Sequence, residues 1–273
     1  MKNILSLLIS GVFILPLFIF SQSAEDKTVQ AGLTFNAGAN ILSPSSTKIG
    51  TDGAGSLLSI GLNLHSAFKS SQNLAVATGI EFDFGKNKYN LSDDAFADFY
   101  DGEYLTSDEA NQMDGDLTSS YSTYNISSRI VSTTKLTVPL MLLFRTNFIG
   151  DFRYFGKFGI RNSFLLTHSI EDLGSLIGGS NDNNLLMRSP GEMFLYNGSI
   201  GLSAGAEWNF VGSTCLVLEA GYFYGITPFF LDRLDSNKTM YTLSGNLIAP
   251  AEKNYFSAAA RQNQLIFKLS ILF

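Results

Sequence analysis

Apolar and polar residues alternate strictly over the last ten residues of the chain. One set is entirely large and apolar, and the other is mixed: Leu265, Phe267, Leu269, Ile271 and Phe273 alternate with Gln264, Ile266, Lys268, Ser270 and Leu272. A period of two indicates an extended strand with one apolar face and one mixed face. About ten residues is also the length that a tilted strand needs to cross a bilayer core. We therefore predict a membrane-spanning strand at this end of the chain.

The same alternation recurs at seven places upstream, which gives eight predicted strands in all. They cover residues 32–40, 56–65, 74–85, 133–146, 153–166, 195–208, 214–226 and 262–273. In the third strand, Ile80, Phe82 and Phe84 alternate with Glu81 and Asp83. A soluble barrel has its bulky apolar groups inside, whereas here they oppose a face of small or charged groups. The pattern therefore favours strands whose apolar faces meet lipid.

Short and long connections alternate between these strands. The short ones are residues 69–73, 147–151 and 209–213, and the long ones are residues 41–55, 90–132, 167–194 and 227–261. Such alternation is typical of bacterial outer-membrane barrels. We therefore predict an all-β fold, a transmembrane up-and-down antiparallel β-barrel of eight strands, integral to the outer membrane. Its short turns and both termini are expected in the periplasm, and its four long loops outside the cell.

Aromatic residues support this arrangement because they collect at the strand ends. The two predicted groups are Phe68, Phe148, Phe152, Tyr154, Trp208, Phe210 and Phe273 at one end, and Phe84, Tyr89, Phe164, Tyr222 and Tyr224 at the other. Amphipathic rings prefer the two membrane interfaces. Pro139, inside the fourth strand, disagrees with a regular ladder because proline has no N–H to donate. We expect a bulge or a locally lost bond there.

The first 23 residues predict a secretory signal peptide, followed by a barrel domain over residues 24–273. Lys2 precedes an apolar stretch at residues 4–20, and small residues at 21–24 offer a cleavage site. A single membrane anchor is the alternative, but the stretch is short, contains Pro16 and lacks a positive flank on its far side. Cys215 is the single cysteine, so no intramolecular disulfide is expected. The net charge of −6 argues against a nucleic-acid partner.

Two segments carry a family resemblance. Residues 136–144 (LTVPLMLLF), a short turn and residues 154–160 (YFGKFGI) resemble the central hairpin of Bacteroidota outer-membrane β-barrel proteins. That family includes PorT, a component of the type IX secretion system. The resemblance implies an outer-membrane barrel and makes Pro139 a family trait, but no motif carries the role of PorT to this chain. Phe273 similarly resembles the terminal aromatic residue that the barrel-insertion machinery reads as an insertion signal.

Ten charged residues are predicted to point into the lumen, where an eight-stranded barrel has room for little besides side chains. They are Glu81, Asp83, Glu207 and Glu219, with Lys135, Arg145, Arg153, Lys157, Arg161 and Lys268. Aligned strands place Glu219 level with Lys268. The same alignment gives two further pairs, Glu207 with Arg153 and Asp83 with Lys135. Buried charges are costly unless they pair, so we expect a structural plug of ion pairs. The alternative is a narrow or gated pore.

The second long loop is acidic, and residues 91–116 contain no Lys or Arg. Its acids are Asp93, Asp94, Asp98, Asp101, Glu103, Asp108, Glu109, Asp114 and Asp116. Their spacing does not match a calcium-binding loop, so we expect solvated charge and no metal site. The aromatic residues among them suggest a contact surface: Phe96, Phe99, Tyr100 and Tyr104.

Catalysis is not expected, because a hydrolase needs a nucleophile oriented by His and a carboxylate. His65 lies at the predicted periplasmic end, and His168 and Ser169 are neighbours that a strand would point to opposite faces. We expect a non-catalytic role in secretion, envelope assembly or surface interaction, without a cofactor. The expected partners are outer-membrane lipid, the insertion machinery and, through the loops, secretion-system or surface partners. A small passive solute channel is the alternative, and a lipid-modifying enzyme is less favoured.

Overall fold

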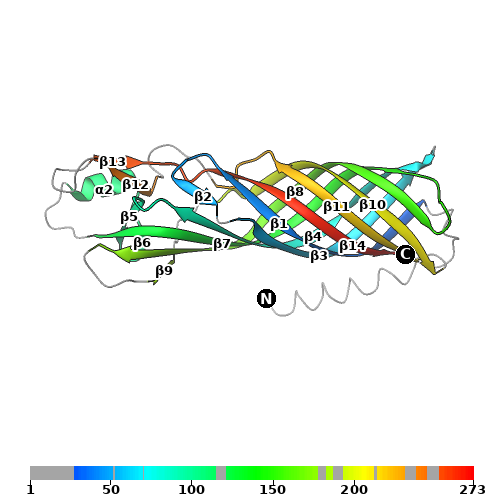
Figure 1. Cartoon of the computed structure of the whole chain (residues 1–273), viewed down its shortest axis with the longest axis horizontal. Coiled ribbons are helices and arrows are strands. Elements are labelled where there is room, and N and C mark those ends of the chain that lie inside the picture. Colours follow the sequence, from blue (N-terminus) through cyan, green and yellow to red (C-terminus); the bar gives the residue numbers. More distant parts are fainter. Residues whose placement is uncertain are drawn as a thin grey trace.

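Eight long antiparallel strands form a closed ring in the computed structural model (Figure 1). They are β1 (Val29–Pro44), β3 (Gly55–Phe68), β4 (Ser71–Leu91), β7 (Ser122–Arg145), β8 (Phe152–Leu176), β10 (Tyr196–Val211), β11 (Thr214–Gly225) and β14 (Ala260–Leu272). Each pairs with the next along the chain, β14 pairs with β1, and β7 pairs with both β4 and β8. The predicted eight-stranded up-and-down β-barrel is confirmed.

The structure describes residues 28–51, 53–69, 71–114, 121–177, 183–186, 193–211, 214–230, 238–244 and 252–273. The predicted signal peptide, residues 1–23, lies outside the described residues. In the described part of the chain, no helix is long and apolar enough to cross a membrane.

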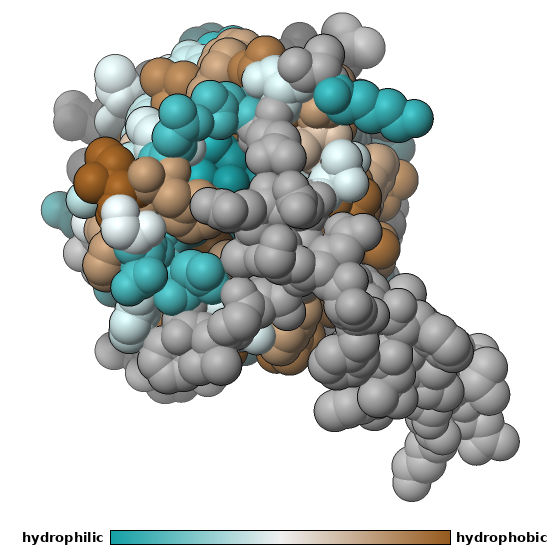
Figure 2. Space-filling view, turned by 90° about the vertical axis from the view of Figure 1, so that its right-hand side faces the viewer, coloured by the Kyte–Doolittle hydropathy of each residue, from teal (hydrophilic) through white to brown (hydrophobic). Residues whose placement is uncertain are grey.

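The two faces of each strand separate as the alternation predicts. In β14, Phe267 is 58% exposed on the outer wall, whereas Lys268 and Leu272 point inward and are buried. In β4, Ile80 and Phe82 are exposed, while Glu81 and Asp83 are buried. Figure 2 views the short-turn end of the molecule, where hydrophobic residues lie at the top and at the left edge among hydrophilic ones. An apolar exterior around a polar interior is the arrangement that a lipid-facing barrel requires.

Among the side chains that the structure describes, the aromatic residues form the two expected groups, with the exception of Tyr89. Phe152 and Trp208 stack on each other at the short-turn end, with ring centroids 5.9 Å apart. At the other end, Phe164 and Tyr222 are exposed on the outer wall. Tyr89 is the exception, because it is buried and packs against Phe230, 5.7 Å away. Its assignment to the outer belt was wrong, since β4 passes beyond the belt at this point and its odd-numbered residues face inward.

The four long connections are not simple loops. Much of their length folds into short elements: β2 (Ile49–Thr51), β5 (Phe96–Tyr100), β6 (Glu103–Tyr104), α2 (Ser107–Asp114), β9 (Asn183–Leu186), β12 (Met240–Ser244) and β13 (Glu252–Tyr255). β7 and β8 run on past the outer-wall aromatic residues, and β5, β12 and β13 continue their sheet on one side while β9 does so on the other. Together these extensions form a projection beyond the barrel, called the platform below (Figure 1).

The platform has a hydrophobic core of its own, which sits over the mouth of the barrel. Its largest fully buried members include Tyr89, Phe229, Phe230 and Ile126. Phe229 and Phe230 pack edge to face, with ring centroids 5.0 Å apart. At the start of α2, Thr106 and Glu109 form a capping box, in which Glu109 accepts bonds from the backbone N–H and the hydroxyl of Thr106. The platform is therefore a folded unit and not a set of independent loops.

Pro139 interrupts one ladder without creating a bulge. The pairing of β4 with β7 stops at Thr78, opposite Leu140, and resumes at Glu81, opposite Thr137. The register is the same on both sides of the gap. Two side chains bind the backbone oxygens at the gap: Thr78 Oγ1 donates to Pro139 O at 2.8 Å, and Asn162 Nδ2 donates to Val138 O at 3.2 Å. Of the two expected outcomes, the locally lost bond is the one observed.

Candidate functional site

All ten charged residues predicted for the lumen lie inside the barrel, each at most 9% exposed. Each sits on an inward position of its strand because the polar members of the alternation share one face. Apolar side chains fill part of the same interior towards the short turns, among them Leu143, Phe155, Val217 and Leu272. The lumen is thus occupied by side chains along its length.

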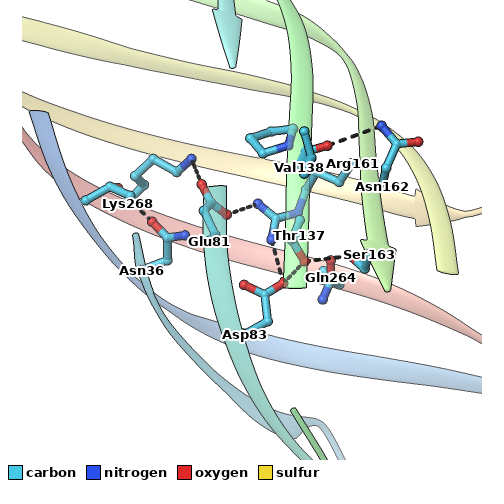
Figure 3. Close-up of polar contacts among 12 residues, drawn as sticks. Asn36, Glu81, Asp83, Thr137, Val138, Arg161, Asn162, Ser163, Gln264 and Lys268 are labelled. Carbon is cyan, nitrogen blue, oxygen red and sulfur yellow. Dashed lines mark hydrogen bonds and ion pairs between the residues drawn. The ribbon is translucent and has the colours of Figure 1, made fainter. Parts of the chain in front are cut away.

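The central part of this network is built around Glu81 (Figure 3). Its two oxygens accept hydrogen bonds from Arg161 Nη1 at 2.7 Å and from Lys268 Nζ at 2.6 Å. The second guanidinium nitrogen of Arg161 donates to Asp83 Oδ2 at 2.9 Å, and Thr137 Oγ1 donates to the same oxygen at 2.7 Å. Multiple charge-assisted bonds of this kind are what buried charges need to offset their desolvation.

A second cluster lies nearer the short turns and centres on Glu207. Arg153 binds Glu207 through two guanidinium nitrogens, with Nε at 2.7 Å from Oε2. Arg145 Nε lies 3.2 Å from the other oxygen of Glu207. His65 fills the space between two cations, with Nδ1 2.8 Å from Arg145 Nη2 and Nε2 3.3 Å from Lys157 Nζ. His65 was not predicted to belong to the network, although the alternation in residues 56–65 already placed it on the inward face.

The three predicted pairs are opposite each other in their ladders, but only Glu207 and Arg153 are in contact. Glu219 and Lys268 are opposite each other in the β11–β14 ladder, as are Glu207 and Arg153 in the β8–β10 ladder. However, Glu219 accepts from Lys157 at 2.6 Å, while Lys268 binds Glu81. Lys135 is opposite Asp83 but donates to Gln262 Oε1 at 2.8 Å. The lumen is narrow, so a long side chain reaches across it as easily as to its ladder neighbour.

The platform holds buried charges that sequence reasoning missed. Arg129 of β7 donates to both oxygens of Asp172 in β8, at 2.8 and 2.9 Å, and the Tyr104 hydroxyl binds the same carboxylate. All three side chains are buried. Burial and the neighbouring Asp172 carboxylate raise the pKa of Tyr104 well above its usual value. These residues were assigned to loops, where pairing across strands could not be anticipated.

Asp98 shows that the acidic segment is not uniformly solvated. It is 1% exposed and accepts hydrogen bonds from Lys253 Nζ at 2.9 Å, from Thr123 Oγ1 at 2.7 Å and from the Tyr241 hydroxyl at 2.9 Å. The prediction of solvated charge was therefore wrong at this position. Burial and the Asp98 carboxylate raise the pKa of Tyr241.

Lys253 fastens β13 to the rest of the platform. Besides Asp98, its ammonium contacts Asp114 at 3.3 Å and the Tyr121 hydroxyl at 3.0 Å, and it lies over the rings of Tyr121 and Tyr241 at 5.1 and 5.2 Å. Burial lowers the pKa of Lys253, but the bonds to Tyr121 and Asp98 outweigh burial and the pKa is raised. One side chain therefore ties together segments from the second and fourth long connections.

The structure also places the residues weighed for catalysis and for metal binding. His168 and Ser169 follow each other on β8 and are both exposed, as is Glu171. No group of three or more His, Cys, Asp or Glu able to hold a metal ion occurs among the residues that the structure describes. Phe273, the predicted insertion signal, is 38% exposed on the outer wall and its backbone pairs with Ala31.

A closed antiparallel barrel with an apolar exterior and a charged interior belongs to the class of outer-membrane β-barrels. The family model described as "Outer membrane protein beta-barrel domain" matches residues 20–231, and the chain belongs to this family. No curated protein matches the sequence.

Several solved structures are similar to this chain at low sequence identity. Neisserial surface protein A is 8% identical over 90% of this chain and 96% of its own, with a TM-score of 0.38. Ail, the attachment invasion locus protein of Yersinia pestis, solved in complex with the heparin analogue sucrose octasulfate, is 12% identical over 90% of this chain and 100% of its own, with a TM-score of 0.32. The translocator domain of the autotransporter NalP from Neisseria meningitidis is 10% identical over 100% of this chain and 95% of its own, with a TM-score of 0.27.

Proposed function

We propose that this protein is a closed membrane anchor that presents its platform at the cell surface, in a non-catalytic role in secretion, envelope assembly or surface interaction. The observation that carries the proposal is the filled and capped interior. Ion pairs occupy the lumen, and the aromatic residues Phe229 and Phe230 of the platform core lie over its mouth. Because side chains fill the lumen over the described residues, the folded platform is the part of the molecule that can meet a partner.

A passive solute channel is the competing function, and the interior argues against it. Ion-selective pores present charged side chains to a water-filled path. Here the carboxylates of Glu81 and Glu207 are at most 1% exposed and are already bound to cations. Two cavities, one beside Lys135 and one beside Tyr89, each measure about 10 Å³, room for roughly one water molecule.

The proposal includes an orientation for the barrel. In outer-membrane barrels the short turns are periplasmic and the longer connections face outward. The short turns and the carboxyl terminus of this chain lie at one end and the platform at the other (Figure 1). The terminal Phe273 is proposed as the signal for the insertion machinery, which would leave both termini in the periplasm and the platform outside.

Cysteine labelling on intact cells tests this orientation and the exposure of the platform. The native Cys215 is fully buried and gives an unreactive background. Tyr100→Cys, at a platform position that is 51% exposed, is expected to react with a membrane-impermeant maleimide. Lys69→Cys, beside a short turn, is the control and is expected to react after lysis alone. Labelling of Lys69→Cys and not of Tyr100→Cys on intact cells would contradict the proposal.

A further inference from the structure

A small polar cavity lies where the ion-pair plug meets the platform core. It measures about 10 Å³ and is bounded by β7, β8, β10, β14 and the segment that follows β11. Its wall includes the ammonium-bearing Lys135, the hydroxyl residues Ser163, Ser199 and Thr227, and the amides Gln262 and Gln264. The lining contains no carboxylate. Hydroxyl, amide and ammonium groups can all donate hydrogen bonds into such a space.

Lys135 differs from the other lumen cations in its partners. Arg145, Arg153, Lys157, Arg161 and Lys268 each contact a carboxylate. Lys135 is 4% exposed and donates to the neutral amide oxygen of Gln262 at 2.8 Å, with its Nζ 4.7 Å from the centre of the Phe229 ring. Asp83, its neighbour in the ladder, directs Oδ2 to Arg161 and Thr137, and its buried Oδ1 accepts no hydrogen bond from Lys135 or from any other group in the structure.

The charges in the described lumen do not balance. Six cationic side chains and four carboxylates are buried there, which leaves two formal positive charges in excess. An ammonium without a counter-charge is costly to bury. Either the amine gives up its proton or an anion joins it.

We infer that a small monovalent anion of the chloride class binds in this cavity, held by Lys135 and the surrounding hydroxyl and amide groups. The wall has the chemistry that such an ion needs, namely one amine group able to carry a positive charge, several neutral donors and no acid. Its size admits a single small species, which excludes phosphate, sulfate and organic acids. The anion supplies one of the two missing counter-charges, the one beside Lys135, and completes the plug beneath Phe229.

Water is the competing occupant, and one wall residue would suit it. Asn197 has a buried side-chain oxygen with no hydrogen-bond donor in the structure. A water could donate a hydrogen bond to that oxygen and accept one from Lys135. An anion could accept from Lys135 but could not donate to Asn197. The excess positive charge decides in favour of the anion, and the experiment below separates the two.

Halide substitution tests the site directly in the full-length protein. Crystals grown in sodium bromide are expected to show an anomalous peak in the cavity within contact distance of Lys135 Nζ. In solution, unfolding is compared in sodium chloride and in sodium gluconate, whose anion is too large for the cavity, at equal ionic strength. An anion that binds the folded state alone should lower the unfolding equilibrium constant by about tenfold at about ten times its dissociation constant.

Two variants make the result specific. Lys135→Met is expected to lose both the bromide peak and the chloride dependence, and Lys135→Gln serves if the methionine variant does not fold. Lys86→Met, which alters an exposed lysine on the outer wall, is the matched control and should keep both. No bromide peak together with identical unfolding in the two salts would overturn the inference in favour of water. A peak that persists in Lys135→Met would mark an adventitious ion only.

Discussion

Arg161 and Glu81 form an ion pair across the lumen, from strands that are not neighbours in the ring. Arg161 Nη1 of β8 lies 2.7 Å from Glu81 Oε2 of β4, with β7 between the two strands, and each side chain is 1% exposed. Glu81 also binds Lys268 of β14 at 2.6 Å, so bonded side chains reach across the lumen from β8 to β14, where a solute would have to pass. The pair is therefore the clearest physical sign that the barrel is closed at its centre.

Removal of the Arg161 charge should destabilise the barrel strongly. Arg161→Met leaves Asp83 without a cation and Glu81 with Lys268 alone, and breaking a buried pair in this way typically costs about 3–5 kcal/mol. The double variant Arg161→Met, Asp83→Asn should recover part of the loss because it removes a stranded charge. Urea unfolding in lipid vesicles measures both, with Lys86→Met as a control expected to change stability by under about 0.5 kcal/mol. Equal stability of wild type and Arg161→Met would contradict the plug.

Glu219 should couple energetically to Lys157 more strongly than to Lys268. The Lys157 ammonium is 2.6 Å from Glu219, whereas Lys268 is its ladder neighbour but binds Glu81. A double-mutant cycle with Glu219→Gln and Lys157→Met should give a coupling energy of about 1–3 kcal/mol. The matched cycle with Lys268→Met should give less. If the second cycle gave the larger coupling, ladder register rather than reach across the lumen would govern the pairing.

Tyr255 should titrate late when the pH is raised. Burial raises its pKa from 10.0 to about 12, so the folded protein keeps this proton where the unfolded chain loses it. The resulting stabilisation is present below pH 10 and is lost as the pH rises through 12. Absorbance at the tyrosinate band should therefore contain a component near pH 12 that Tyr255→Phe removes. Tyr100→Phe, at an exposed platform position, is the control and should leave that component in place.

Deletion of Phe273 should affect membrane insertion more than stability. The ring is partly exposed on the outer wall, and its backbone makes two bonds with Ala31 at the very end of the ladder. The truncated chain is expected to reach the periplasm but to yield less heat-modifiable barrel in the outer membrane. Phe267→Ala, which removes an aromatic ring from the same face of β14 in mid-strand, should assemble normally. Full assembly of the truncated chain would show that the terminal aromatic residue is not an insertion signal.

The barrel could be predicted from the sequence because the environment of each residue, lipid or lumen, is visible in the alternation of neighbouring residues. Lipid outside and side chains inside impose a period of two, and in β14 that period is unbroken from Gln264 to Phe273. The residues that lie opposite each other in the ladders could be predicted as well, because strands of known length joined by short turns have little freedom of register. Which cation meets Glu81 could not be predicted, because both partners come from strands other than those beside β4 in the ring.

The platform was missed for a different reason. β7 carries irregularities in its pairing with β8 between Ile126 and Ser128 and between Thr134 and Lys135. The irregularity beside Lys135 skips Leu166 of β8, so the inward positions of β8 change from odd numbers, such as Arg161, to even numbers, such as Asp172. A single period fitted to residues 153–166 therefore could not be extended to Asp172, the partner of Arg129, which lies in sequence that looked like loop.

Conductance of the purified protein in planar lipid bilayers tests the closed anchor most directly. Insertion of the full-length wild-type barrel is expected to leave the current at the level of the bare bilayer, in high salt and at either polarity. A steady open conductance that appears with the folded protein would contradict it, because ions could then pass a lumen in which Arg161 and Glu81 meet. In that case the passive channel would become the better account of the protein.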